Sequence, residues 1–172
     1  MSFRALRQQI RNDLNAHHGD WTRPGFRAIA VYRFGVWRMG VKPKWLRGPL
    51  SALYKWGFRH CRNVYGIELP YTCTIGEGVI IEHQGGIVIH GATVIGDRCI
   101  IRQNCTLGIR RLGSLDDAPI LCADVQVGAG AVILGKVTIG QGAAIGANAV
   151  VLTDVPAGAL AIGIPATIRQ RL

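Results

Sequence analysis

Aliphatic residues recur every six positions through the second half of the chain. The series opens at Ile75 and Ile81, slips by two residues through Gly85 and Gly86, and resumes at Ile89. Its later members are Ile95, Ile101, Leu107, Leu121, Val127, Ile133, Ile139, Ile145 and Val151. On an α-helix a spacing of six carries apolar positions around the axis, whereas a solenoid with one short strand and one turn per repeat stacks them inward. The twelve units, taken three to a coil, predict a parallel β-helix of about four coils.

The repeat has one long interruption. From Leu107 to Leu121 the chain uses fourteen residues, where two units would use twelve, and the intervening sequence is polar and irregular. We expect residues 108–120 to leave the solenoid wall as an excursion loop. Binding residues are often carried by such loops on a rigid scaffold, although an insertion without function is the alternative.

The N-terminal part of the chain has a helical pattern. Helices are predicted at residues 2–15 and 23–39, and from Leu46 or Pro49 to Val64, with aromatic residues interleaved with Lys and Arg. These helices must bury their apolar faces on one another, on the first coil, on another subunit or on a membrane surface.

The predicted fold is therefore mainly β. We expect a basic α-helical cap at 1–66, the solenoid at 67–158 with its excursion loop, and a C-terminal tail at 159–172.

The charge of the chain is concentrated in the predicted cap. The formal net charge is +10, from 20 Lys and Arg against 10 Asp and Glu. Up to Pro70 the chain carries 13 basic and 3 acidic residues, and beyond it 7 of each. A basic cap is compatible with an anionic membrane face, a solvated surface or a subunit contact, and no nucleic-acid motif accompanies it.

Cysteine usage and hydropathy favour the cytoplasm. The five cysteines form no CxxC pair, so we expect buried, reduced thiols and no metal site. The sequence has neither a signal-peptide pattern nor about 18 consecutive apolar residues. A cytoplasmic protein is predicted, with peripheral contact at the inner membrane face as an option.

Several segments resemble the hexapeptide-repeat acyltransferases of the serine acetyltransferase type. They are IGEGVIIEHQGGIVIHGATVIGDRCIIRQNCTLG, VGAGAVILGKVTIGQGAAIGANAVV, VPAGALAIGIPATI and, in the cap, AVYRFGVW. The short cap is most similar to that of related enzymes from surface-polysaccharide pathways. The resemblance implies a left-handed β-helix, a homotrimer with active sites between subunits, and direct acetyl transfer from acetyl-CoA to a hydroxyl group without a metal.

Three residues match catalytic positions of this family. His83 matches its catalytic histidine, and an imidazole suits the removal of a proton from a hydroxyl group as the oxygen attacks a thioester. Glu68 matches an acid that hydrogen-bonds the histidine, and Glu82 matches a second acid on the acceptor side. Both acids are usually aspartate in the family, so the longer side chains here must be placed differently.

The acceptor side departs from the family. Serine acetyltransferases carry an arginine and histidine pair where this chain has Asp117 and Ala118. Without that pair a serine carboxylate lacks its usual cation, unless Arg110 or Arg111 supplies one. His90 either lines the acceptor pocket near His83 or is an exposed corner residue.

The donor side is matched by small residues. Gly108, Ala129, Gly146 and Ala147 correspond to places where the family lays the pantetheine arm of the donor along the solenoid, since small side chains permit close backbone approach. Each is equally well explained as a corner residue of a coil. Arg169, with Arg171, either contacts nucleotide phosphates or belongs to a solvated tail.

The sequence leaves three functions open. The first is acetyl-CoA-dependent O-acetylation of a sugar hydroxyl in a cell-surface polysaccharide or glycan precursor, which is favoured by the missing cationic pair and the short cap. The second is O-acetylation of serine for cysteine synthesis. The third is a non-catalytic β-helix used as a structural or binding module.

Overall fold

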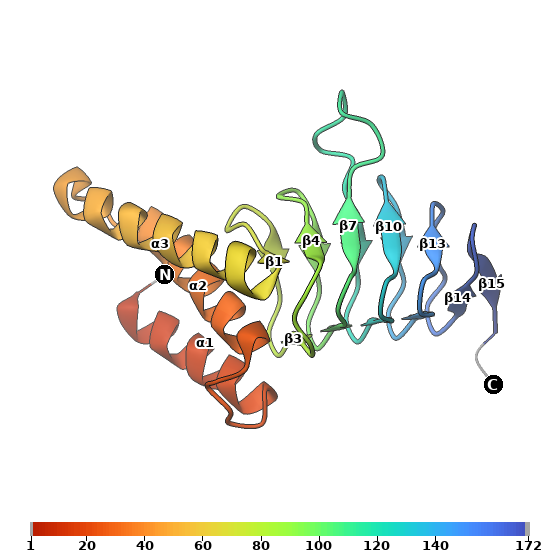
Figure 1. The fold of residues 1–172 in the computed structure, drawn as a ribbon, viewed down its shortest axis with the longest axis horizontal. Helices are drawn as coiled ribbons and strands as arrows, with labels where there is room; N and C mark the ends of the chain where they lie inside the picture. The colour runs from red at the N-terminus through yellow and green to blue at the C-terminus, as the bar shows by residue number, and fades with distance from the viewer. Residues whose placement is uncertain (1, 171–172) are drawn as a thin grey trace.

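A computed structural model describes residues 2–170 of the chain. Three helices precede a β-solenoid (Figure 1): α1 (Phe3–Ala16), α2 (Pro24–Met39) and α3 (Lys44–Tyr65). The hydroxyl of Ser2 caps α1 by accepting a hydrogen bond from the backbone N–H of Ala5. Helix α3 ends at Gly66, whose φ of 66° is the left-handed conformation that glycine adopts readily. The chain enters the solenoid at the next residue.

Short strands form the three walls of the solenoid. They are β1 (Ile67–Glu68), β2 (Thr74–Ile75), β3 (Ile80–Ile81), β4 (Ile87–Ile89), β5 (Val94–Ile95), β6 (Ile100–Ile101), β7 (Thr106–Gly108), β8 (Ile120–Leu121), β9 (Gln126–Val127), β10 (Val132–Leu134), β11 (Thr138–Ile139), β12 (Ala144–Ile145), β13 (Val150–Val151), β14 (Leu160–Ile162) and β15 (Thr167–Arg169). Sheet A has the order β1-β4-β7-β10-β13, sheet B β2-β5-β8-β11 and sheet C β3-β6-β9-β12-β14-β15. All neighbours are parallel except β14 and β15.

The predicted left-handed parallel β-helix with a helical cap is confirmed. The solenoid continues past both ends of the six-residue repeat, so sheet A contains five strands. Ile67 pairs with Ile87 across a coil of 20 residues, and Ile145 pairs with Ala161 across only 16. These first and last coils depart from the 18-residue coil of a regular repeat, which is why the periodicity does not reveal them. Residues 160–162, expected in the tail, form strand β14.

The excursion loop is longer than the sequence indicated. Leu107 and Leu121 lie in β7 and β8, which are consecutive strands, so one unit of six residues would separate them and the remaining eight form the loop. Ile95 and Leu121, which pair between β5 and β8, are 26 residues apart in the chain because this coil contains the loop. The expectation that two units span this interval is therefore wrong. In Figure 1 the loop projects beyond the end of β7.

The core is a stack of aliphatic layers inside the solenoid. The inward-facing residues are almost fully buried: Ile67, Ile75, Ile81, Ile87, Ile89, Ile95, Ile101, Leu107, Leu121, Val127, Ile133, Ile139, Ile145 and Val151. Truncating one such side chain to alanine typically costs about 2–5 kcal/mol. The repeat therefore supplies both the shape and the stability of the scaffold.

Side chains of α2 cover the open edge of the first coil. The hydroxyl of Tyr32 donates to the carbonyl of Cys73 at 3.0 Å and accepts from the N–H of Ile75 at 3.1 Å. Arg33 donates to the carbonyls of Ile75 and Gly76 at 2.8 and 2.5 Å. An uncovered edge would expose these groups as a template for strand addition, so the cap closes the solenoid.

Four of the five thiols are buried in this scaffold, and Cys122 is partly exposed. All five cysteines are free, and burial raises the pKa of Cys73 to about 12 and that of Cys61 to about 11. Residues 2–170 contain no cluster of three or more metal-ligating side chains. Within the same residues, no helix has the length and apolar character needed to cross a membrane.

Candidate active site

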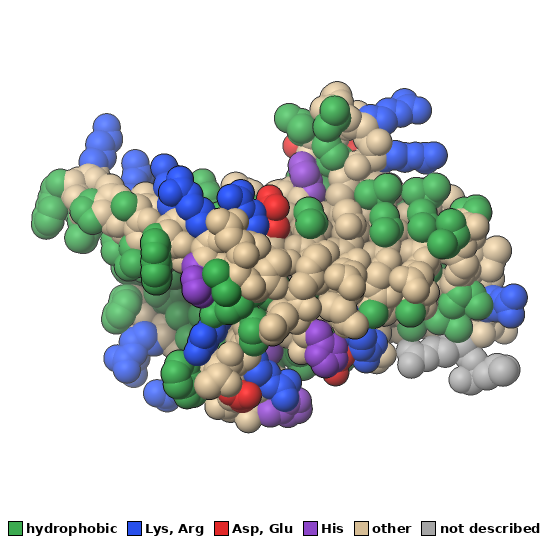
Figure 2. All heavy atoms as spheres, in the orientation of Figure 1, with side chains coloured by type: hydrophobic (Ala, Val, Ile, Leu, Met, Phe, Trp, Pro, Cys, Tyr) green, Lys and Arg blue, Asp and Glu red, His purple; other side chains and the backbone are tan. Residues whose placement is uncertain are grey.

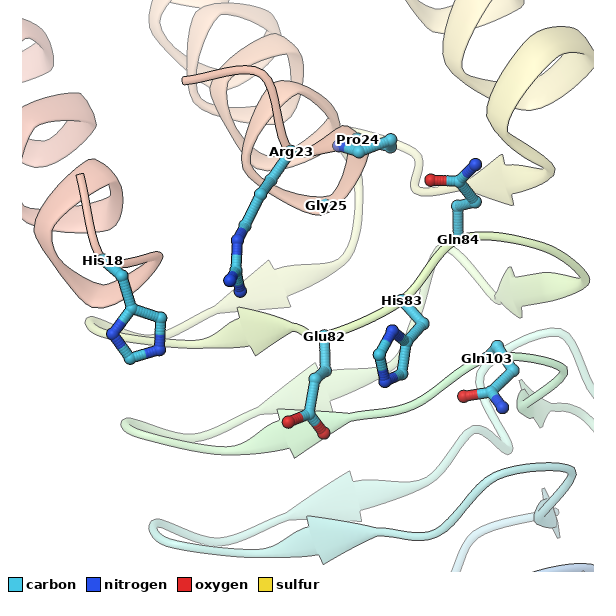
Figure 3. A pocket seen from close by; sticks show the side chains of 8 residues that line it. All are labelled: His18, Arg23, Pro24, Gly25, Glu82, His83, Gln84 and Gln103. Atoms are coloured by element: carbon cyan, nitrogen blue, oxygen red, sulfur yellow. The ribbon is translucent and has the colours of Figure 1, made fainter. Parts of the chain in front are cut away.

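His83 lies at the corner where the chain turns from sheet C to sheet A, two residues after β3. Its exposed side chain faces a pocket of about 720 Å³ between the solenoid and the connection from α1 to α2 (Figure 3). The lining residues are His18, Arg23, Pro24, Gly25, Glu82, His83, Gln84 and Gln103. An imidazole in an open pocket of this size is accessible to a small acceptor molecule.

Glu82 is held beside His83 by a neighbouring coil. Its Oε2 lies 2.7 Å from Nε of Arg102, in an ion pair that lacks hydrogen-bond alignment. Both side chains are partly exposed, so the pair serves chiefly to fix the carboxylate. Figure 3 shows Arg23 pointing from the cap toward β3, the strand that directly precedes Glu82 and His83. The pocket thus combines acidic and basic groups around the imidazole.

The corner itself is shaped by two glycines. Gly85 and Gly86 have φ values of 102° and 61°, which residues with side chains rarely adopt. They account for the two additional residues of the first coil, and Asn104 on the next coil donates its N–H to the carbonyl of Gly85 at 2.8 Å. The slip seen in the sequence therefore widens the turn that presents His83.

The cap positions the strand that leads to His83. Nδ1 of His17 lies 2.8 Å from the carbonyl of Asp13, and its Nε2 accepts the N–H of Ile81 at 3.3 Å. The ring must be neutral to donate through one nitrogen and accept through the other, and burial lowers its pKa from 6.5. Gly25 meets the carbonyl of Ile81 so closely that a Cβ there would overlap the oxygen.

Small residues continue the corner of His83 along the solenoid. The pairing of β3, β6, β9 and β12 places His83, Gln103, Ala129 and Ala147 at the same position of successive coils. Backbone bonds join this column, with the N–H of Asn148 donating to the carbonyl of Ala129 at 2.8 Å. On the coils that follow Gln103 in the chain, the small side chains of Ala129 and Ala147 therefore leave the backbone at this corner open to a ligand. Gly146 directly precedes Ala147 and belongs to the same corner.

Other predicted residues lie on the opposite edge of sheet A. His90 follows β4, and Gly108 is the last residue of β7, so both lie at the ends of the strands away from His83. Arg110 and Asp117 lie on the excursion loop above them, where they line a pocket of about 240 Å³ that also contains Lys136. Within one chain, the structure does not bring these residues to His83.

Two further predicted residues lie apart from the imidazole. Glu68 is on β1 in sheet A and pairs with Val88. Among the described residues, no hydrogen bond or ion pair joins Glu68 to His83. Arg169 is on β15 and pairs with Leu160, the first residue of β14. It therefore lies at the starting ends of the parallel strands of sheet C, whereas His83 follows the end of one of these strands. Arg171 lies outside the described residues.

Sequence reasoning missed six of the eight residues that line this pocket: His18, Arg23, Pro24, Gly25, Gln84 and Gln103. Gln103 follows from the repeat, because it stands 20 residues after His83 as Ile101 does after Ile81. His18 and Arg23 lie in the connection between α1 and α2, where no periodic pattern marks them. Only the packing of the cap against β3 brings these two residues to the pocket.

Comparisons with known proteins identify the family of this chain. Residues 118–153 match the family model described as bacterial transferase hexapeptide (six repeats). The serine acetyltransferase of Helicobacter pylori is 37% identical over 143 residues, which are 83% of this chain and 80% of that protein. The chain belongs to the serine acetyltransferase family of hexapeptide-repeat acyltransferases. A serine acetyltransferase of Synechococcus elongatus is also 37% identical, over 86% of this chain and 58% of its own length.

Solved structures of the family share the fold of nearly all of this chain. Soybean serine acetyltransferase in complex with serine superposes with a TM-score of 0.80 at 31% identity, over 95% of this chain and 69% of that one. The chain spans little more than half the length of the Synechococcus family member. The matched proteins carry the serine acetyltransferase name, so the expected closer relationship to polysaccharide-pathway enzymes is not confirmed.

Proposed function

We propose that this chain is an acetyl-CoA-dependent O-acetyltransferase in which His83 is the general base. The observation that carries the proposal is the exposed imidazole of His83 at a widened corner, facing a pocket of about 720 Å³. The resemblance of the sequence around His83 to the family's stretch around its catalytic histidine supports the same role. Family membership supports the same reaction class.

The proposed reaction needs one proton to move through His83. The acceptor hydroxyl oxygen attacks the thioester carbonyl of acetyl-CoA while the imidazole takes its proton. The carbon–sulfur bond then breaks, and the imidazolium returns the proton to the leaving thiolate. Glu82, fixed by Arg102, orients the acceptor beside the imidazole. Ala129 and Ala147 line the edge along which the pantetheine arm lies.

We infer that the complete site forms between subunits of a homotrimer. His83 and the excursion loop lie at opposite edges of sheet A in one chain, so a single chain cannot bring both into contact with the same acceptor molecule. A cyclic trimer brings the loop edge of one solenoid to the His83 edge of the next. Glu68 completes the proposed catalytic set by orienting the imidazole in the assembled site.

L-Serine is the acceptor that the family relationship favours. The loop pocket holds Arg110, Arg111 and Lys136 beside Asp117, so cations for a carboxylate are present although the family's usual pair is absent. The second candidate is a sugar hydroxyl of a surface polysaccharide, which Asp117 and Ala118 favour because they replace that pair.

A thiol-release assay tests the proposal. Purified protein is given acetyl-CoA with L-serine or with a panel of sugars, and free CoA is measured over time. Fast release with serine supports the first acceptor, and release only with a sugar supports the second. His83→Ala should lower kcat by about 10²–10⁴-fold while the oligomer stays folded. Wild-type turnover by this variant would remove His83 from the mechanism, and no turnover with any acceptor would favour a non-catalytic module.

A further inference from the structure

Helix α3 presents large apolar side chains to solvent. Trp45 is 79% exposed, Leu53 54%, Trp56 68% and Val64 64%. At 100° per residue, these positions fall within an arc of about 100° on the helix surface. A different arc, with Tyr54 and Gly57 among its residues, packs against the rest of the protein. The exposed arc is therefore a second apolar face.

Cationic side chains lie beside this exposed face. Lys44, Lys55, Arg59 and Arg62 are all exposed and occupy an arc of about 60° on its other side. The helix contains no Asp or Glu anywhere between Lys44 and Tyr65. An exposed apolar arc with Trp and Leu beside a purely cationic arc is typical of helices that lie in the interface of an anionic membrane.

The apolar face continues into a groove between α2 and α3. This groove has a volume of about 310 Å³, and Trp21, Phe26, Val31 and Trp56 are among the side chains that line it. Figure 2 shows hydrophobic and basic side chains gathered together on the cap. In Figure 1, α3 extends from the first coil to the far end of the cap, away from the solenoid. The first turns of α3 are thus placed to meet a flat surface.

We propose that the outward face of α3 docks the protein on an anionic lipid bilayer. Trp45, Leu53 and Trp56 enter the headgroup region, and the neighbouring Lys and Arg side chains contact acidic phospholipids. A second copy of α3 is a poorer occupant, because an antiparallel two-fold contact between the apolar faces would place the two cationic arcs side by side. The surface acts independently of the chemistry at His83.

Vesicle sedimentation tests the docking. The full-length protein is mixed with phosphatidylcholine vesicles that contain or lack phosphatidylglycerol, and the bound fraction is measured. Binding should require the anionic lipid and weaken as salt is raised. Tryptophan fluorescence should shift to the blue on binding, because indole rings enter a less polar medium.

Three triple variants locate the surface. Trp45→Ser/Leu53→Ser/Trp56→Ser removes apolar anchors, and Lys55→Glu/Arg59→Glu/Arg62→Glu reverses the cationic arc; each should weaken binding by about tenfold or more. The matched control is Arg4→Glu/Arg7→Glu/Arg11→Glu, which makes the same change in net charge on α1. These α1 arginines are exposed, and Figure 1 shows α1 and α3 on opposite sides of α2. The control should retain most of the binding.

Several results would overturn the proposal. Binding to neutral vesicles as strong as to anionic ones would remove the cationic role, and no binding to either would remove the docking. An equal loss of vesicle binding in the α1 control would show that binding depends on the net charge of the protein and not on the face of α3. A smaller oligomer in the serine variant, measured by light scattering without lipid, would assign the face to another copy of the chain. Preferential binding of RNA over vesicles would assign it to nucleic acid.

Discussion

Nε2 of His17 accepts a 3.3 Å hydrogen bond from the backbone N–H of Ile81, two residues before the proposed general base. The helical cap is thereby attached to the strand that leads into the active-site corner. Beside this contact, Asp13 and Arg33 form a buried ion pair at 2.9 Å, and Arg33 also binds two carbonyls of the first coil. A substitution that displaces the cap is therefore expected to alter the geometry of the active-site corner as well.

Stability should fall at acidic pH because of His17. Burial lowers its pKa from 6.5, so at this residue the folded state binds fewer protons than the unfolded state. The free energy of unfolding should drop as pH falls through about 6.5, and the contribution of His17 should level off below its lowered folded pKa. Urea denaturation at about pH 7.5 and about pH 5.5 measures this difference.

A substitution at His17 separates its contribution from those of other titrating groups. His17→Leu should reduce the pH dependence and cost about 1–3 kcal/mol near neutral pH, because the N–H of Ile81 loses its partner. The exposed His60, changed to Gln, is the control and should leave the pH dependence intact. An unchanged pH dependence in His17→Leu would contradict the assignment.

Gly25→Ala should damage the site through packing. The new Cβ would overlap the carbonyl oxygen of Ile81, so α2 must move away from β3 and the pocket at His83 must change shape. We expect lower thermal stability and reduced acetyl transfer. Gly48→Ala on α3 is the control, because nothing lies within 4 Å of its added Cβ and alanine favours a helix by about 1 kcal/mol. Wild-type stability in Gly25→Ala would show that the contact relaxes without cost.

Ala129→Leu should weaken donor binding. A larger side chain at this position of the column that contains His83, Gln103, Ala129 and Ala147 would keep the pantetheine arm away from the backbone. KM for acetyl-CoA should therefore rise by about tenfold or more, with little change in kcat. Ala123→Leu is the control, because Ala123 has the equivalent position two residues after Leu121, at another corner of the same coil. Equal effects of the two substitutions would point to general strain in the coil.

Mixed oligomers should regain activity if the site lies between subunits. His83→Ala chains are co-refolded with chains whose residues 111–116 are replaced by a Gly-Ser segment. Random assembly at equal amounts should restore about a quarter of the wild-type sites, each with His83 from one chain and the loop from the next. A mixture no more active than its two components would place the whole site in one chain. Full activity of the loop variant alone would exclude the loop from the site.

By itself the sequence determined the solenoid, because burial of one aliphatic residue in every six depends only on the period of the chain. It also marked the two-residue slip at Gly85 and Gly86. The column of corner residues that His83 shares with Gln103, Ala129 and Ala147 was recognised only from the register of the paired strands. Tertiary structure decided how the cap joins the site, because His17 and Ile81 are 64 residues apart and belong to no common repeat. It also decided that His83 and the excursion loop lie on opposite edges of sheet A, since the direction of the strands and the handedness of the coil place each corner in space.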